Sequence, residues 1–143
     1  MDADPWDFET SPYERQKLAH LLSCIPPTCS CFAVELGCAT GIGTRKLGMR
    51  SDRVLAVDAS ETALALAGTR CADMGHGRFV RAFLPRDYPA AEALGCDLVI
   101  LSGILYFLDS DDIRRLARRV MRSATKDAAL LLVHWTGYTD TPC

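Results

Sequence analysis

The sequence lacks the long apolar stretch that a membrane-spanning helix needs. Such a helix takes about 20 consecutive apolar residues, and no run in this chain of 143 residues approaches that length. The acidic start, Met1 to Trp6, also lacks the basic and apolar regions of a secretory signal peptide. We therefore expect a cytoplasmic protein with no membrane partner.

The sequence also lacks an excess of positive charge and the paired cysteine spacing of a zinc site. Sixteen Lys and Arg residues against 18 Asp and Glu residues leave a formal net charge of -2, so no basic field favours a nucleic acid as partner. The seven cysteines do not have the paired spacing of a zinc site. We expect reduced thiols, no metal, and a small molecule or a neutral polymer as partner.

The length and composition favour a single domain over residues 1–143. With 49% hydrophobic residues the chain can bury one core, and it is too short for two ordinary domains. An amino-terminal cap helix is predicted over 10–26, because Ser11 to Glu14 has the form of a capping box and Pro26 cannot continue a helix. The core is predicted over 31–137.

Apolar runs in this core predict an α/β fold. The runs are nearly continuous rather than alternating, which is typical of parallel strands buried on both faces. The segments between them are long enough for crossover helices, of which the clearest begins after Asp109 and continues through Val120. We predict a Rossmann-like, doubly wound parallel sheet of about five strands. The expected strands are 32–36, 54–57, 98–101 and 130–133, with a weaker one at 79–82.

Two glycines and an aspartate indicate a nucleoside site at the carboxyl ends of these strands. Gly37 and Gly41 lie where the first strand turns into a helix, and residues without a β-carbon let a ligand lie against the backbone. Asp58 ends the next strand about 20 residues later, where a carboxylate can accept hydrogen bonds from ribose hydroxyls.

The spacing of the loop separates two classes of nucleoside-binding enzyme. A nicotinamide-dependent oxidoreductase is one alternative, but its Gly-x-Gly-x-x-Gly fingerprint fits neither frame: the frame from Gly37 meets Ala39, and the frame from Gly41 meets Lys46. The segment 35–41, Glu-Leu-Gly-Cys-Ala-Thr-Gly, instead resembles the first motif of class I methyltransferases.

Several further segments together resemble the NodS family of nodulation methyltransferases. They are Asp4-Pro5-Trp6, Ser11 to Arg15, Glu35 to Ala39, Asp97-Leu98-Val99 and Leu105 to Leu108. The resemblance implies transfer of a methyl group from S-adenosyl-L-methionine to the amine of a deacetylated chitooligosaccharide, a step in the synthesis of nodulation signals. It also implies a chain truncated at its carboxyl terminus, without the final helix and antiparallel hairpin of the fold.

The same resemblance implies the site residues. The expected cofactor contacts are Glu35, Gly37, Cys38, Ala39 and Gly41 in the loop, Asp58 and Ala59 after the second strand, Phe83 and Leu84 at the adenine edge, and Ser102. Because an amine must be neutral to attack, a base within reach would help. Tyr106 and His134 are the candidates, each weighed against a purely structural role.

Two departures from the family support a second hypothesis. Phe83 stands where relatives commonly carry an aspartate that bonds the adenine amino group, and Gly103 stands where they often carry a glutamate. In addition, the last predicted strand would have an exposed edge that favours self-association. The alternative is a non-catalytic remnant that binds a nucleoside or a partner chain.

Overall fold

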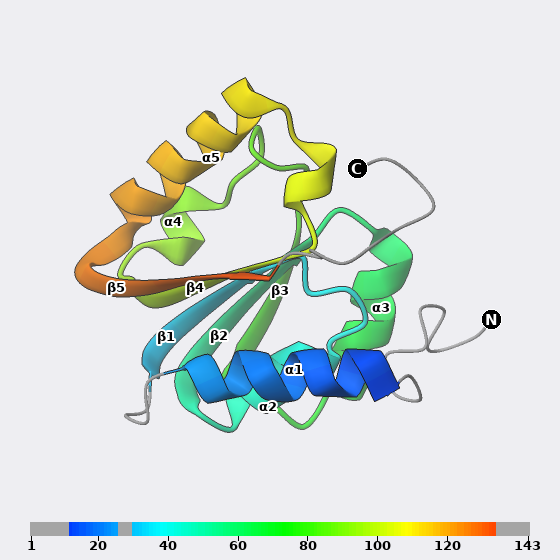
Figure 1. Ribbon diagram of the computed structural model, residues 1–143. Coiled ribbons are helices and arrows are strands. Elements are labelled where there is room, and N and C mark those ends of the chain that lie inside the picture. Colours follow the sequence, from blue (N-terminus) through cyan, green and yellow to red (C-terminus); the bar gives the residue numbers. More distant parts are fainter. Residues whose placement is uncertain (1–11, 26–29, 134–143) are drawn as a thin grey trace.

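A parallel sheet of five strands divides the protein into two helical layers (Figure 1). The computed structural model describes residues 12–25 and 30–133. The strands lie in the order β3-β2-β1-β4-β5, and each neighbouring pair is parallel. This confirms the predicted doubly wound sheet. The strands are β1 (Ser30–Leu36), β2 (Ser51–Asp58), β3 (Gly77–Arg81), β4 (Cys96–Ser102) and β5 (Ala124–Val133).

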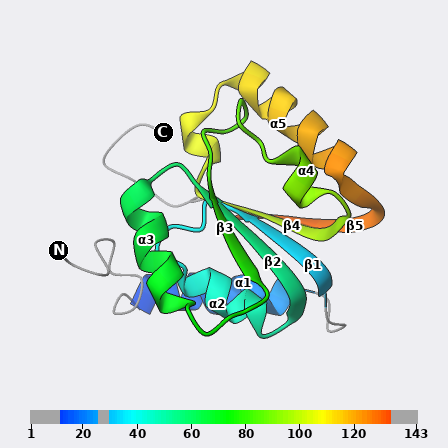
Figure 2. The same ribbon diagram turned by 180° about the vertical axis from the view of Figure 1, so that it is seen from behind.

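Helices cover both faces of this sheet. Figures 1 and 2 show α1, α2 and α3 on one face, and α4 and α5 on the other. No helix in the described ranges is long and apolar enough to cross a membrane. The helices are α1 (Pro12–Cys24), α2 (Ile42–Gly48), α3 (Glu61–Arg70), α4 (Ala90–Ala93) and α5 (Ser110–Ser123).

The two helices predicted from capping signals are present. α1 begins at Pro12 and ends at Cys24, while Ser11 and Pro26 lie outside the described residues. α5 begins after Asp109, whose carboxylate accepts a hydrogen bond of 2.8 Å from the amide of Asp112. That bond satisfies one of the free amides of the first turn.

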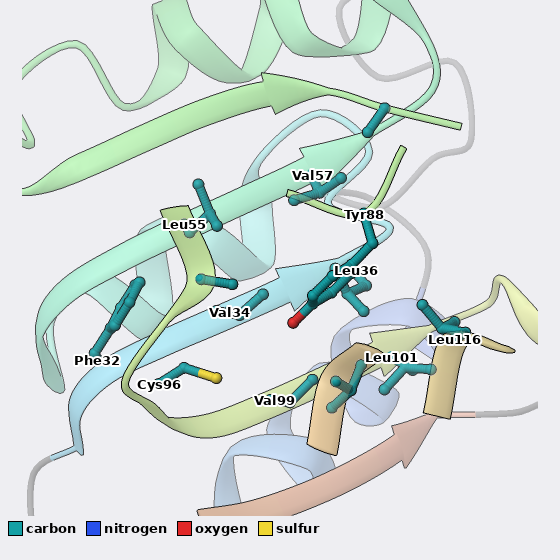
Figure 3. Close-up of a cluster of buried hydrophobic side chains, with 13 residues drawn as sticks. Phe32, Val34, Leu36, Leu55, Val57, Tyr88, Cys96, Val99, Leu101 and Leu116 are labelled. Atoms are coloured by element: carbon teal, nitrogen blue, oxygen red, sulfur yellow. The ribbon is translucent and has the colours of Figure 1, made fainter. Parts of the chain in front are cut away.

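The core forms two clusters because side chains alternate across each strand. Figure 3 shows the larger cluster, on the α4 and α5 face, which includes Val34, Leu36 and Leu55 of the strands and Leu116 of α5. The smaller cluster, on the opposite face, joins residues 33, 54, 98 and 100 of the strands to α1 and α2. Burial on both faces is the reason that the strands read as continuous apolar runs.

The last strand begins earlier than predicted. β5 starts at Ala124, directly after α5, whereas the apolar run predicts a start at Leu130. The register between β4 and this first part of β5 is irregular, and residues 125–127 are exposed. Because their side chains are polar, this part of the strand does not show as an apolar run in the sequence. Within the described residues the outer side of β5 has no neighbouring strand, and Leu130 and Leu132 are 54% and 58% exposed.

Candidate functional site

A pocket of about 550 Å³ lies at the carboxyl ends of the strands. It sits where β1 and β4 are neighbours and the direction of the chain connections reverses, which is where open α/β sheets bind ligands. Nine of the ten residues predicted to contact the cofactor line it, and Gly41 does not. The nine are Glu35, Gly37, Cys38, Ala39, Asp58, Ala59, Phe83, Leu84 and Ser102.

The loop between β1 and α2 forms the floor of the pocket and needs its glycines. Gly37 has φ +89°, and a β-carbon there would lie 2.5 Å from the carbonyl oxygen of Ser102. Gly41 has φ +88°, and its β-carbon would lie 2.9 Å from the α-carbon of Ala67 in α3. Gly41 therefore allows the turn to pack closely against α3, outside the pocket. Gly37 allows the ends of β1 and β4 to approach each other at the pocket.

Asp58 fastens this loop to the neighbouring strand. Its Oδ2 accepts a hydrogen bond of 2.9 Å from the amide of Ala39, a non-glycine residue at φ +48°. Its Oδ1 accepts one of 2.9 Å from the amide of Ser60, the N-cap of α3. Because a carboxylate offers about four acceptor positions, Asp58 keeps capacity for two ligand hydroxyls.

Glu35 forms the buried end of the pocket. Only 4% of its surface is exposed, and the hydroxyl of Thr44 in α2 donates a hydrogen bond to its Oε1. Burial raises the pKa of Glu35 to about 7, the bond from Thr44 opposes that rise, and the charge of Asp58 adds to it. Gly43 leaves space for this carboxylate, since a β-carbon there would lie 2.7 Å from its Oε2.

Cys38 contributes packing and no nucleophile. Its side chain is buried beside the pocket, and burial raises the pKa of the thiol, with the charges of Glu35 and Asp58 adding to the rise. A thiol in such a place stays neutral and unreactive. In the described part of the chain, no group of three or more His, Cys, Asp or Glu residues is placed to hold a metal ion.

Much of the apolar wall could not be inferred from the sequence. Leu18 and Leu21 of α1 close one side of the pocket, and Ile104, Phe107 and Leu108 after β4 close another. These side chains meet only through the tertiary packing of α1 across the sheet. For Leu18 and Leu21 the sequence signal is their helical spacing, which by itself indicates only that the helix packs against something.

The two candidate catalytic residues stay predictions. Tyr106 belongs to a 3₁₀ turn, Leu105–Phe107, whose neighbours line the pocket, but its side chain is outside the described part of the structure. His134 follows Val133, which lines the pocket, and itself lies outside the described residues.

Comparison with known proteins identifies the family. The model of the Nodulation protein S (NodS) family matches residues 1–133. The chain belongs to this family. It is 27% identical over 130 residues to Nodulation protein S of Bradyrhizobium diazoefficiens and 27% identical over 110 residues to that of Sinorhizobium fredii. This NodS-family chain spans 61% and 48% of those two relatives, while the matches cover 90% and 74% of the chain itself.

Solved structures share the fold of this NodS-family chain. A candidate methyltransferase from Pseudomonas syringae is 35% identical, with a TM-score of 0.74 and coverage of 84% of this chain and 74% of that one. N-methyltransferase NodS from Bradyrhizobium japonicum, in complex with S-adenosyl-L-homocysteine, is 23% identical, with a TM-score of 0.83 over 92% of this chain and 66% of that one. The fold is therefore that of class I methyltransferases.

Proposed function

We propose that this chain binds S-adenosyl-L-methionine and methylates an amine. The observation that carries the proposal is the convergence of the glycine loop, Asp58 and Glu35 on one pocket at the switch point of the sheet. Family membership supports the same reading, since related proteins are named N-methyltransferases. We also propose a cytoplasmic location.

The donor groups of the pocket fit the three parts of this cofactor. Asp58 has spare acceptor positions for two ribose hydroxyls, and Glu35 offers a buried carboxylate for an ammonium group. Gly37, Cys38 and Ala39 present backbone beside these two acids. Phe83 and Leu84 supply apolar surface for a base. The pocket lining is mostly apolar, which suits exclusion of water.

The chain's own residues would act mainly by positioning. S-adenosyl-L-methionine supplies an electrophilic methyl carbon bonded to a sulfonium. Attack on it must be in line, so an acceptor held in a dry pocket reacts faster than one in water. Ile104, Phe107 and Val133 line the pocket, and the acceptor amine would lie beside them. Tyr106 and His134 are the proposed groups that would keep that amine neutral.

The proposed acceptor is the amine of a deacetylated chitooligosaccharide. This assignment follows the family and is tested by methyl transfer from isotopically labelled S-adenosyl-L-methionine to a chitosan oligomer, followed by mass spectrometry. The wild-type chain should add a methyl group to an amine of the oligomer, and an Asp58→Ala variant should transfer much less in the same time at a limiting concentration of the cofactor. Cofactor binding without any transfer to amino sugars would overturn the acceptor and leave the cofactor assignment intact.

A second candidate is a protein without methyl transfer that binds a nucleoside, or a partner chain through its exposed sheet edge. Two observations favour it. Gly103 lines the pocket with nothing within 4 Å of the place where a side chain would begin, so no acid acts from that position. Leu130 and Leu132 leave apolar surface on the outer strand. Methyl transfer to the chitosan oligomer would rule it out.

A further inference from the structure

A half-exposed phenylalanine stands at one end of the pocket. Phe83 follows β3 and is 49% exposed, although it lines a pocket. The amide of Ala82, one residue earlier, donates a hydrogen bond of 3.1 Å to the carbonyl oxygen of Asp58. Phe83 therefore lies next to the strand end that carries Asp58, the carboxylate proposed to bind ribose, and about half of the phenylalanine is exposed there.

The polar groups near this ring are already engaged. The amide of Phe83 donates to Oδ2 of Asp87 at 3.2 Å. Among the described residues that line the pocket, Glu35 and Asp58 are the carboxylates. Both oxygens of Asp58 accept from the amides of Ala39 and Ser60, and the remaining acceptor positions of Asp58 are those proposed for the ribose hydroxyls. Glu35 is bonded to Thr44 on α2. Among the described residues that line the pocket, no further carboxylate is therefore available to accept a hydrogen bond from the amino group of a base at Phe83.

Two arginines lie over the ring of Phe83, and the residue is still 49% exposed. The guanidinium carbons of Arg81 and Arg86 lie 5.6 and 5.7 Å from the ring centroid, near the outer limit of a cation–π contact. Arg81 is held by the carbonyl oxygen of Ala59 at 3.0 Å, and Arg86 by the carboxylate of Asp87 at 3.0 Å. The guanidinium groups thus help to hold the ring in place, and about half of the residue's surface remains available to a ligand.

We propose that Phe83 determines base recognition by stacking, so that the site binds a purine through its ring face and discriminates poorly at its 6-amino group. Every base has a π-face, so an aromatic platform tolerates changes at the base edge. A site built to hydrogen-bond a group instead rejects the analogue that lacks it. The proposal rests on the proposed function and adds to it how selective the site is.

The test is isothermal titration of the whole chain with two ligands. One is S-adenosyl-L-homocysteine, and the other is its analogue in which hydrogen replaces the 6-amino group. The two dissociation constants should agree within about threefold. Phe83→Ala should weaken both ligands by a similar factor, about ten- to hundredfold. Phe83→Tyr, which keeps the ring, should bind both ligands like the wild type.

Control variants separate loss of stacking from loss of folding. Phe83→Leu keeps apolar volume without a π-face and should bind as poorly as Phe83→Ala. Met121→Ala changes an exposed residue of α5 away from the pocket and should bind like the wild type. Thermal unfolding of each variant checks that the fold is retained.

The outcomes distinguish the inference from the proposed function. A folded wild-type chain that binds neither ligand would overturn both. A wild-type preference of more than tenfold for the 6-amino ligand would overturn the inference and leave cofactor binding standing. Unchanged affinity in Phe83→Ala or Phe83→Leu would also overturn it.

Discussion

The central part of the pocket and its two flanks differ in how closely the fold constrains them. In the central part, after the neighbouring strands β1 and β2, Gly37 lies against the carbonyl group of Ser102 at the end of β4, and Asp58 bridges the loop to α3. At the flanks, after β3 and after β4, Phe83 and Phe107 are 49% and 83% exposed, and Gly103 faces open space. The difference teaches that the parts of the pocket proposed for ribose and methionine are built into the fold, whereas those proposed for the base and the acceptor are shaped by a few exposed side chains.

The largest expected loss of stability is at Gly37, in the central part of the pocket. Gly37→Ala should lower the free energy of unfolding by about 2 to 5 kcal/mol, because alanine is strained at φ +89° and its methyl group meets the Ser102 carbonyl oxygen. Gly103→Ala, at φ +67° with open space around it, should cost about 1 to 2 kcal/mol. Urea denaturation measures both. Equal losses of unfolding free energy in the two variants would contradict the claim that Gly37 is more tightly constrained than Gly103.

The next largest effect is the pH dependence of stability caused by Glu35, the buried acid in the central part of the pocket. The pKa of Glu35 is raised from 4.5 to about 7 in the folded protein, so the folded state binds its proton more tightly than the unfolded state. Stability from this group is therefore complete below about pH 4.5 and is lost as the pH rises to 7. At about 1.36 kcal/mol per pKa unit the loss is roughly 3 kcal/mol.

Replacing this acid with its amide tests that dependence. The free energy of unfolding of Glu35→Gln, relative to the wild type, should rise by roughly 3 kcal/mol between pH 4.5 and pH 8. Glu61→Gln, at an exposed position in the first turn of α3, is the control and should follow the wild type. A constant difference between wild type and Glu35→Gln across this range would show that Glu35 is not buried as an acid.

Asp58 should matter for both the ligand and the loop. Asp58→Ala removes the two acceptors that hold Ala39 and Ser60 and the acceptors proposed for the ribose. Affinity for S-adenosyl-L-homocysteine should fall about ten- to hundredfold, as expected for lost hydrogen bonds to a charged group. Titration calorimetry measures this, with Met121→Ala as the control. An unchanged affinity would remove Asp58 from the site.

The smallest expected effect is on the outer strand. Leu132→Thr changes an exposed side chain on β5, so the free energy of unfolding should change by less than about 1 kcal/mol. If the β5 edge binds a second chain, the same substitution should reduce self-association in sedimentation velocity experiments. A loss of stability well above this value would mean that Leu132 is packed, contrary to its exposure.

The sequence predicts the strands and the loop better than it predicts the walls of the pocket. The buried strands leave apolar runs, and the acid-capped start of α5 is equally visible. The polar residues 125–127 leave no apolar run at the beginning of β5, and α4 is too short to show a helical period. The bond between Thr44 and Glu35 and the approach of Leu18 depend on how helices pack across the sheet, which no local pattern records.

Titration of the wild-type chain with S-adenosyl-L-homocysteine tests the central claim most directly. The claim is that the glycine loop, Asp58 and Glu35 form a working cofactor site. It predicts saturable binding of one ligand per chain, weakened by Asp58→Ala and left unchanged by Met121→Ala. A folded wild-type sample that releases or absorbs no heat of binding at millimolar ligand would contradict it.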